Sequence, residues 1–139
     1  MIKFSRLSQI EHKDYPFEDA VAAADTFNGA FGDVAEGSFS VAEKKVKAIM
    51  QLEVGDDAEM PTYKIAKGDH VRVVDLTKFA GELVEVYGDE VPADATKGSK
   101  LTSDATGALK VDGAATAPYF EVTRVIGNKL GVEVKVVTE

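Results

Sequence analysis

Two stretches near the carboxyl terminus contain alternating apolar and polar residues and are separated by a short turn. Tyr119 to Ile126 and Leu130 to Val137 flank the turn Gly127-Asn128-Lys129. In the second stretch Val132, Val134 and Val136 share one side, because successive side chains of a strand point to opposite faces. Gly-Asn is a favoured hairpin turn. The pattern therefore predicts an antiparallel hairpin with one face in a core and the other in solvent.

The composition extends this prediction to most of the chain. The 18 valines outnumber the 7 leucines and 5 isoleucines, and β-branched residues favour strands. From Thr26 onward, short apolar runs are separated by glycine-containing turns, and Asp104 to Gly107 has the residues of a type I turn. We expect a mainly β fold, a small β-sandwich or partly open β-barrel of about seven to nine short strands with at most one short helix.

The segment from Lys45 to Val54 is a further predicted strand. Its alternation places Val46, Ala48, Met50, Leu52 and Val54 on one face. A helix is the alternative, but it would leave Leu52 away from the apolar stripe.

The first 25 residues have a different character. They mix charges with scattered aromatic residues and show no sustained period, so we expect an extended N-terminal arm over residues 1–25 ahead of a single β-rich domain over residues 26–139. Pro16 could open a short helix that runs through residues 20–24.

Length and charge exclude several classes of protein. The 139 residues suffice for one core, and a net charge of −8 disfavours binding to nucleic acid or to an anionic membrane. The chain has no cysteine, which excludes disulfides and thiol nucleophiles. The amino terminus lacks the apolar core of a secretion signal and no stretch reaches about 18 apolar residues, so we expect a soluble protein without a leader.

The polar candidates do not form a recognisable catalytic or metal-binding motif. The residues considered are His12 and His70, the acidic group Asp56, Asp57 and Glu59, the turn Lys67-Gly68-Asp69, and the basic cluster Lys44, Lys45 and Lys47. Their spacing matches neither a zinc site nor an EF-hand loop. We interpret the basic cluster as a solvated strand edge. The expectation is a protein that is not an enzyme and has no catalytic, cofactor-binding or metal-binding residues.

Four stretches resemble small virion proteins of tailed bacteriophages, which are encoded beside the major capsid protein. They are residues 49–56 (IMQLEVGD), 67–76 (KGDHVRVVDL), 87–92 (YGDEVP) and 118–122 (PYFEV). The likeness covers roughly residues 26–139. It lies in the local sequence of the four stretches and in their order along the chain. It implies a head decoration, or cement, protein that binds the outside of the mature shell.

The resemblance implies the major capsid protein as partner, a possible homotrimer on the capsid and a place on the virion surface after synthesis in the bacterial host cytoplasm. An arm that orders on docking could supply the contacts. The candidate contact residues are Ile2, Phe4, Leu7, Ile10, Tyr15 and Phe17. Packing of these side chains onto the protein's own barrel is the alternative. A phage tail or baseplate protein, a carbohydrate-binding β module and a small β-barrel enzyme also stay open, although the absence of tryptophan disfavours glycan binding.

Overall fold

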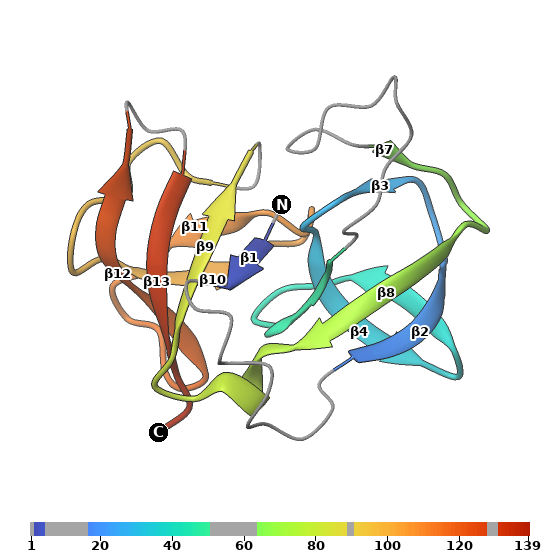
Figure 1. Cartoon of the computed structure of the whole chain (residues 1–139), viewed down its shortest axis with the longest axis horizontal. Coiled ribbons are helices and arrows are strands. Elements are labelled where there is room, and N and C mark those ends of the chain that lie inside the picture. Colours follow the sequence, from blue (N-terminus) through green and yellow to red (C-terminus); the bar gives the residue numbers. More distant parts are fainter. Residues whose placement is uncertain (1, 5–16, 51–63, 89–90, 128–130) are drawn as a thin grey trace.

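The two largest parts of the fold are a six-stranded β-sheet and a five-stranded β-barrel, which stand side by side (Figure 1). The computed structural model describes residues 2–4, 17–50, 64–88, 91–127 and 131–139. It is mainly β, with thirteen strands, more than the seven to nine expected. One sheet has six strands, a second closes into a five-stranded barrel, and a two-stranded ribbon lies beside the barrel.

The six-stranded sheet is antiparallel throughout. Its order is β1 (Ile2–Phe4), β9 (Leu83–Tyr87), β13 (Gly131–Val137), β12 (Tyr119–Ile126), β10 (Lys100–Ser103) and β11 (Leu109–Val111). The predicted carboxyl-terminal hairpin is confirmed, with Val122 opposite Val134 and a bulge before Arg124. Its valine face is buried as expected, since Val132, Val134 and Val136 are at most 1% exposed.

The barrel contains the strands of the first half of the chain. Its order is β2 (Phe17–Ala22), β5 (Ser38–Val41), β4 (Phe31–Ala35), β6 (Lys47–Ile49) and β8 (His70–Asp75). Only the β2–β5 pair is parallel. The ribbon pairs β3 (Thr26–Phe27) with β7 (Lys64–Ile65), and a 3₁₀ turn, η2 (Leu76–Phe79), connects β8 to β9 of the other sheet.

Two strands of the barrel wall are buried on both faces. In β8, Val73 belongs to the apolar cluster inside the barrel, whereas Val74 belongs to a larger cluster that includes the valines of the six-stranded sheet. In β6, Ile49 belongs to the cluster inside the barrel and Ala48 belongs to the larger cluster. Because successive side chains point to opposite faces, β6 and β8 form a wall between two cores.

The larger cluster joins the two sheets, and we call it the shared core. The rings of Phe31 in β4 and Phe120 in β12 lie 5.4 Å apart at 58°, a favourable tilted geometry. The backbone N–H of Phe31 also donates to the carbonyl of Gly107, in the turn between β10 and β11. The sheets are therefore joined by apolar packing and by main-chain hydrogen bonds.

The predicted helix over residues 20–24 is wrong. Residues Phe17–Ala22 form β2, where Ala20 and Ala22 are buried and Val21 is 41% exposed. Alanine favours helices, but pairing with β8 and β5 closes the barrel and outweighs that local preference. Of the predicted strand over residues 45–54, only Lys47–Ile49 form a strand, β6, and Ile49 is buried together with Ala48, so one face is not left in solvent; Leu52 and Val54 lie outside the described residues.

The described parts of the predicted arm are strands of both sheets. β1 pairs with β9 along the edge of the six-stranded sheet, and β2 pairs with β8 in the barrel. Residues 5–16, which connect these two strands, lie outside the described residues.

Candidate functional site

Two adjoining pockets lie where the barrel meets the six-stranded sheet, and together we call them the junction groove. Each has a volume of about 270 Å³, and they share Lys44 and Pro118. The first pocket is otherwise lined by Thr102, Asp112 and residues 114–117. The second is otherwise lined by Gly32, Asp33, Lys45, Val46, Lys47, Asp75 and Thr77. The groove thus collects most of its charged groups from the barrel side.

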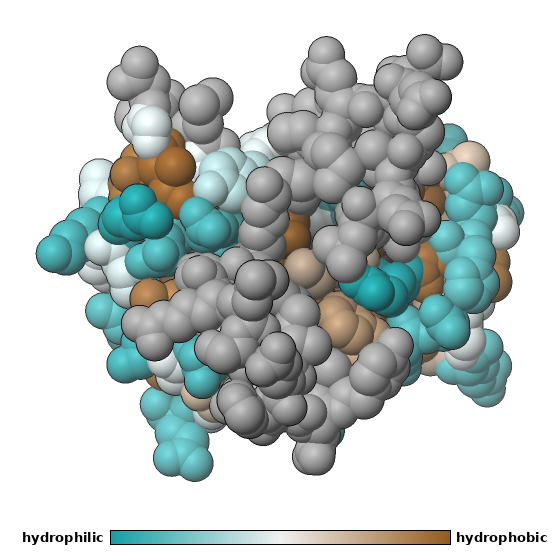
Figure 2. All heavy atoms as spheres, in the orientation of Figure 1, coloured by the Kyte–Doolittle hydropathy of each residue, from teal (hydrophilic) through white to brown (hydrophobic). Residues whose placement is uncertain are grey.

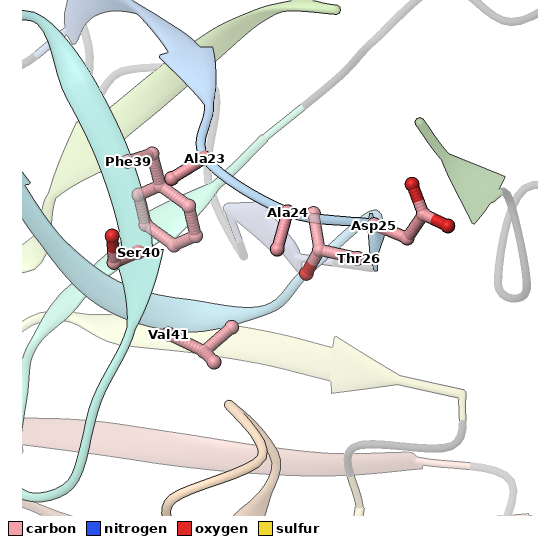
Figure 3. Close-up of a pocket in the computed structure, with 7 residues that line it drawn as sticks. All are labelled: Ala23, Ala24, Asp25, Thr26, Phe39, Ser40 and Val41. Carbon is pink, nitrogen blue, oxygen red and sulfur yellow. The ribbon is translucent and has the colours of Figure 1, made fainter. Parts of the chain in front are cut away.

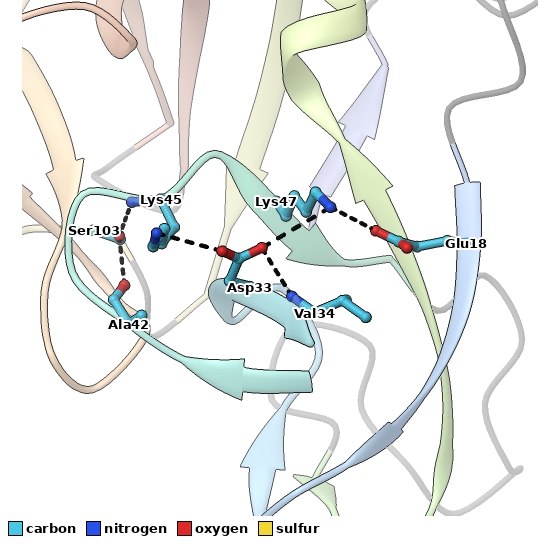
Figure 4. Close-up of polar contacts among 7 residues, drawn as sticks. All are labelled: Glu18, Asp33, Val34, Ala42, Lys45, Lys47 and Ser103. Carbon is cyan, nitrogen blue, oxygen red and sulfur yellow. Dashed lines mark hydrogen bonds and ion pairs between the residues drawn. The ribbon is translucent and has the colours of Figure 1, made fainter. Parts of the chain in front are cut away.

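A buried serine fixes the turn that carries Lys44 (Figure 4). Ser103 Oγ donates to the carbonyl of Ala42 at 2.8 Å and accepts the backbone N–H of Lys45 at 2.8 Å. The Ser103 carbonyl accepts the N–H of Lys44 at 3.0 Å. These bonds hold Lys44 at φ 55°, a left-handed conformation that costs a residue other than glycine roughly 1–2 kcal/mol. Lys44 is thereby held at the point that the two pockets share.

The other two lysines of the basic cluster are paired (Figure 4). Lys45 Nζ lies 3.3 Å from Asp33, and Lys47 Nζ lies 2.8 Å from Glu18 and 3.9 Å from Asp33. The hydrogen bond to Glu18 outweighs desolvation and raises the pKa of Lys47. Partial burial on its own would raise the pKa of Asp33, but the N–H of Val34 and the two ammonium groups outweigh it and lower that pKa.

The interpretation of this cluster as a strand edge is wrong. β6, which carries Lys47, pairs with β4 on one side and with β8 on the other in a closed barrel, so it is not an edge strand. Lys45 and Lys47 instead form ion pairs with Glu18 of β2 and Asp33 of β4. Among the described residues, no ion pair or hydrogen bond engages the side chain of Lys44, so its ammonium is the cation that the groove leaves available.

Two neighbouring hydroxyl groups on β10 differ in how they are satisfied. Ser103 is fully buried and uses its hydroxyl as both donor and acceptor. Thr102 is 4% exposed and lines the first pocket, but its Oγ1 has no hydrogen-bond partner among the described residues. An unsatisfied buried hydroxyl is costly, and because the Thr102 Oγ1 is itself buried, the pocket gains no accessible donor from it.

A third, smaller pocket lies at the end of the barrel (Figure 3). Its volume is about 100 Å³, and it is lined by residues 23–26 and by Phe39, Ser40 and Val41. Asp25, the charged group there, accepts the backbone N–H of Lys67 at 2.8 Å and so is engaged in joining two loops. Ligand pockets are usually about 300–1,000 Å³, and we assign no ligand to this small pocket.

The predicted contact residues fall in different places. Ile2 is 1% exposed and belongs to the shared core, which is the alternative that the sequence left open for it. Phe17 is half-buried against the same core, and the Arg72 guanidinium lies 4.1 Å from its ring centroid. Phe4 is in β1, and nothing is described of its side chain. Leu7, Ile10 and Tyr15 lie outside the described residues.

The other polar candidates are not brought together. His70 is an exposed residue at the start of β8, while His12 and the group Asp56, Asp57 and Glu59 lie outside the described residues. Within the described ranges, no three histidine or carboxylate side chains are placed to share a metal ion. None of the helical segments described is long and apolar enough to cross a membrane.

The part of the surface that Figure 2 colours by hydropathy is largely polar. Hydrophilic side chains spread over the periphery of both halves, and apolar groups reach this face only in small separate patches. The exposed large apolar side chains are Val21, Val41, Val111 and Val125. They come from four different strands or strand ends, two in each sheet.

No model of a protein family matches the sequence, and no curated protein is significantly similar to it.

Proposed function

We propose that this chain is a structural virion protein that binds the outer surface of a tailed-phage capsid and stabilises the mature shell. Its partner would be the major capsid protein, and it would act on the virion surface, singly or as a homotrimer. The observation that carries the proposal is the order of the four stretches that resemble small virion proteins of tailed phages.

Three of those stretches include elements that join the two sheets. Residues 67–76 contain β8, residues 49–56 begin at the end of β6, and residues 118–122 begin β12. Val74, Leu76 and Phe120 from these stretches are all in the shared core. The resemblance therefore concerns residues of the body, and the proposal assigns the capsid contacts to other parts of the chain.

The body itself suits a load-bearing role. Its two sheets share one core and are joined by main-chain hydrogen bonds from Phe31 to Gly107 and from Lys44 to Ser103. Protein interiors packed in this way are stiff and transmit strain between their elements. A protein that holds neighbouring capsid subunits together needs a stiff body and a separate contact surface for each subunit.

The candidate contacts that belong to this proposal are Leu7, Ile10 and Tyr15. They lie on the connection between β1 and β2, which starts at one sheet and ends at the other. Deletion of residues 1–25 would remove a barrel strand and the buried side chains of Ile2, Ala20 and Ala22, so it cannot separate folding from binding. Substitutions within the connection are the better test.

The test is co-sedimentation with expanded and unexpanded shells. The wild-type chain should pellet with expanded shells, and the triple variant Leu7→Ser, Ile10→Ser, Tyr15→Ser should bind at least about tenfold more weakly, because buried apolar anchors dominate interfaces. The double variant Val111→Ser, Val125→Ser is the matched control and should bind like wild type. Failure of the wild-type chain to pellet with any shell state would overturn the proposal, and pelleting with tails alone would favour a tail or baseplate protein.

A further inference from the structure

The first strand of the chain, β1, is tied to the six-stranded sheet on one side only. It has three residues, lies at one edge of the sheet and pairs only with β9 among the described strands (Figure 1). The last strand, β13, pairs with both β9 and β12 and cannot leave without splitting the sheet. Chain ends with few contacts open locally far more often than central strands do. β1 can therefore detach while the rest of the sheet stays paired.

The place that β1 occupies requires an apolar strand. Ile2 lies opposite Val86 and Phe4 lies opposite Val84, and both valines belong to the shared core. The side chain of Ile2 packs in the same core and is 1% exposed. If β1 detached, the main chain of β9 would lose its neighbour on that side, and the core would lose an isoleucine. An open strand edge beside an apolar gap is a template for another strand.

We propose that β1 is exchanged between copies of this chain, so that β1 of one copy pairs with β9 of a second copy. The second copy carries the same strand, and it would restore both the ladder and the buried isoleucine. A partner of different sequence would have to match both features. Exchange of an identical element needs no new interface and is a simple route to a dimer. The inference concerns contacts between copies and does not rest on capsid binding.

The connection between β1 and β2 is long enough to reach a neighbouring molecule. It contains residues 5–16, and a segment of this length spans at most roughly 40 Å. A compact chain of this size has a radius of gyration of about 14 Å. A tethered strand competes for its own sheet at an effective concentration on the order of 1 mM. Closed monomers should therefore dominate at micromolar concentrations, and exchanged copies should become abundant at about 1 mM and above.

Two single-cysteine variants detect the exchange directly, because the natural chain has no cysteine. Lys3 of β1 lies opposite Glu85 of β9, and such Cα pairs are about 4.5–5.5 Å apart, a distance that a disulfide bridges. When Lys3→Cys and Glu85→Cys are mixed at about 1 mM in a glutathione redox buffer, a disulfide between positions 3 and 85 requires exchange. We expect this linkage by mass spectrometry of the digested dimer, with a yield that rises with concentration. Its absence would overturn the inference.

Two further mixtures separate exchange from random collision. Lys110→Cys is the matched acceptor, because Lys110 is half-buried like Glu85 but lies on β11, at the opposite edge of the sheet. Mixed with Lys3→Cys, it should give at least about tenfold less cross-link. A Lys3→Cys donor that also carries Ile2→Ser should lose about tenfold with the Glu85→Cys acceptor, since it cannot displace a strand that keeps its buried isoleucine. Equal yields in either mixture would contradict the exchange.

The double variant Lys3→Cys, Glu85→Cys tests the inference without mixing. Oxidised at about 10 μM, far below the effective concentration of the tethered strand, it should close its disulfide within one chain. Sedimentation at about 1 mM should then find dimers of the wild type and of the reduced variant, but only monomers of the oxidised variant. A wild-type chain that stays monomeric, or an oxidised variant that still dimerises, would overturn the inference. A disulfide from Glu85→Cys to a capsid subunit, with none to Lys3→Cys, would also overturn it and assign the edge to another occupant.

Discussion

The six-stranded sheet and the barrel bury their strands in different ways. The carboxyl-terminal hairpin of the sheet buries alternate residues, so its side chains divide into a core face and an outer face. In β6 and β8 of the barrel, consecutive residues such as Val73 and Val74 are buried, because one face lines the barrel and the other meets the shared core. The comparison teaches that the barrel wall carries the connection between the two sheets.

The largest expected effect concerns close backbone packing at one glycine in each sheet. A Cβ on Gly32 in the barrel would clash with the carbonyl oxygen of Ser40, whereas a Cβ on Gly131 in the sheet would lie 2.5 Å from the Tyr87 ring and 2.7 Å from the carbonyl oxygen of Val86. Gly32→Ala should lower the free energy of unfolding by about 3 kcal/mol or more, since its nearest clash is with the backbone, and Gly131→Ala by about 1–3 kcal/mol, since its backbone clash is less severe.

Denaturant unfolding of both variants measures this difference. Gly113→Ala is the control, because nothing lies within 4 Å of its added Cβ, and its effect should stay within about 0.5 kcal/mol. If Gly32→Ala were as harmless as Gly113→Ala, the barrel could not be closed as described.

The next largest loss of stability is expected for substitutions in the barrel strands that are buried on both faces. Val73→Ala and Val74→Ala should each lower the free energy of unfolding by about 2 kcal/mol, because each leaves a cavity in one of the two cores. Val125→Ala, on the 36% exposed valine of β12, should cost much less. A simple alternating strand would lose stability at only one of the two adjacent positions, and that result in denaturant unfolding would contradict the wall between two cores.

The neighbouring hydroxyls of β10 should respond in opposite directions. Ser103→Ala leaves the buried N–H of Lys45 without its acceptor and should cost about 1–3 kcal/mol. Thr102→Val removes a hydroxyl without a described partner and should leave the free energy of unfolding unchanged or raise it by up to about 1 kcal/mol. Thermal unfolding of the two variants checks this contrast, and a loss of stability in Thr102→Val would mean that its hydroxyl is satisfied within the protein.

The smallest effect is the pH dependence of the ion pairs on the barrel. In the folded protein the pKa of Asp33 is lowered below its ordinary value of 3.8. The contribution of Asp33 to the free energy of unfolding is therefore complete above pH 3.8, and it is lost as the pH falls through the lower pKa of the folded state. Asp33 is 48% exposed, so we expect no more than about 0.2–1 kcal/mol, the range of exposed ion pairs.

Unfolding measured from neutral pH down to about pH 2.5 should show a shallower acid limb in Asp33→Asn than in wild type. Asp94→Asn, at an exposed position, should keep the wild-type slope. The pKa of Lys47 is raised above 10.5, so its contribution is present below that value and is lost at still higher pH. If Asp33→Asn left the acid limb unchanged, the ion pairs of Asp33 would not contribute to the stability of the barrel.

How much could be predicted from the sequence depends on the kind of burial. Val132, Val134 and Val136 follow a period of two, so the hairpin and its buried face could be predicted. β2 ends at the first residue of the run Ala22-Ala23-Ala24, which favours a helix, and pairing with β8 outweighs that local preference. Ile49 falls on the polar side of the alternating pattern but is fully buried, because the barrel supplies a second core.

The candidate site was harder to predict for the same reason. The basic cluster around Lys44 is visible in the sequence, but the pairing of Lys45 and Lys47 depends on Glu18 and Asp33, which are distant in the chain. Thr102 and Ser103 are small polar residues at the end of a short strand, and their sequence carries no signal that distinguishes a satisfied hydroxyl from an unsatisfied one.

Imaging of expanded tailed-phage shells mixed with this protein tests the proposed function most directly. The account predicts added density on the outer surface of the shell, in contact with the major capsid protein and matching a body of a five-stranded barrel beside a six-stranded sheet. Shells that show no added density at protein concentrations that saturate a control decoration protein would contradict it.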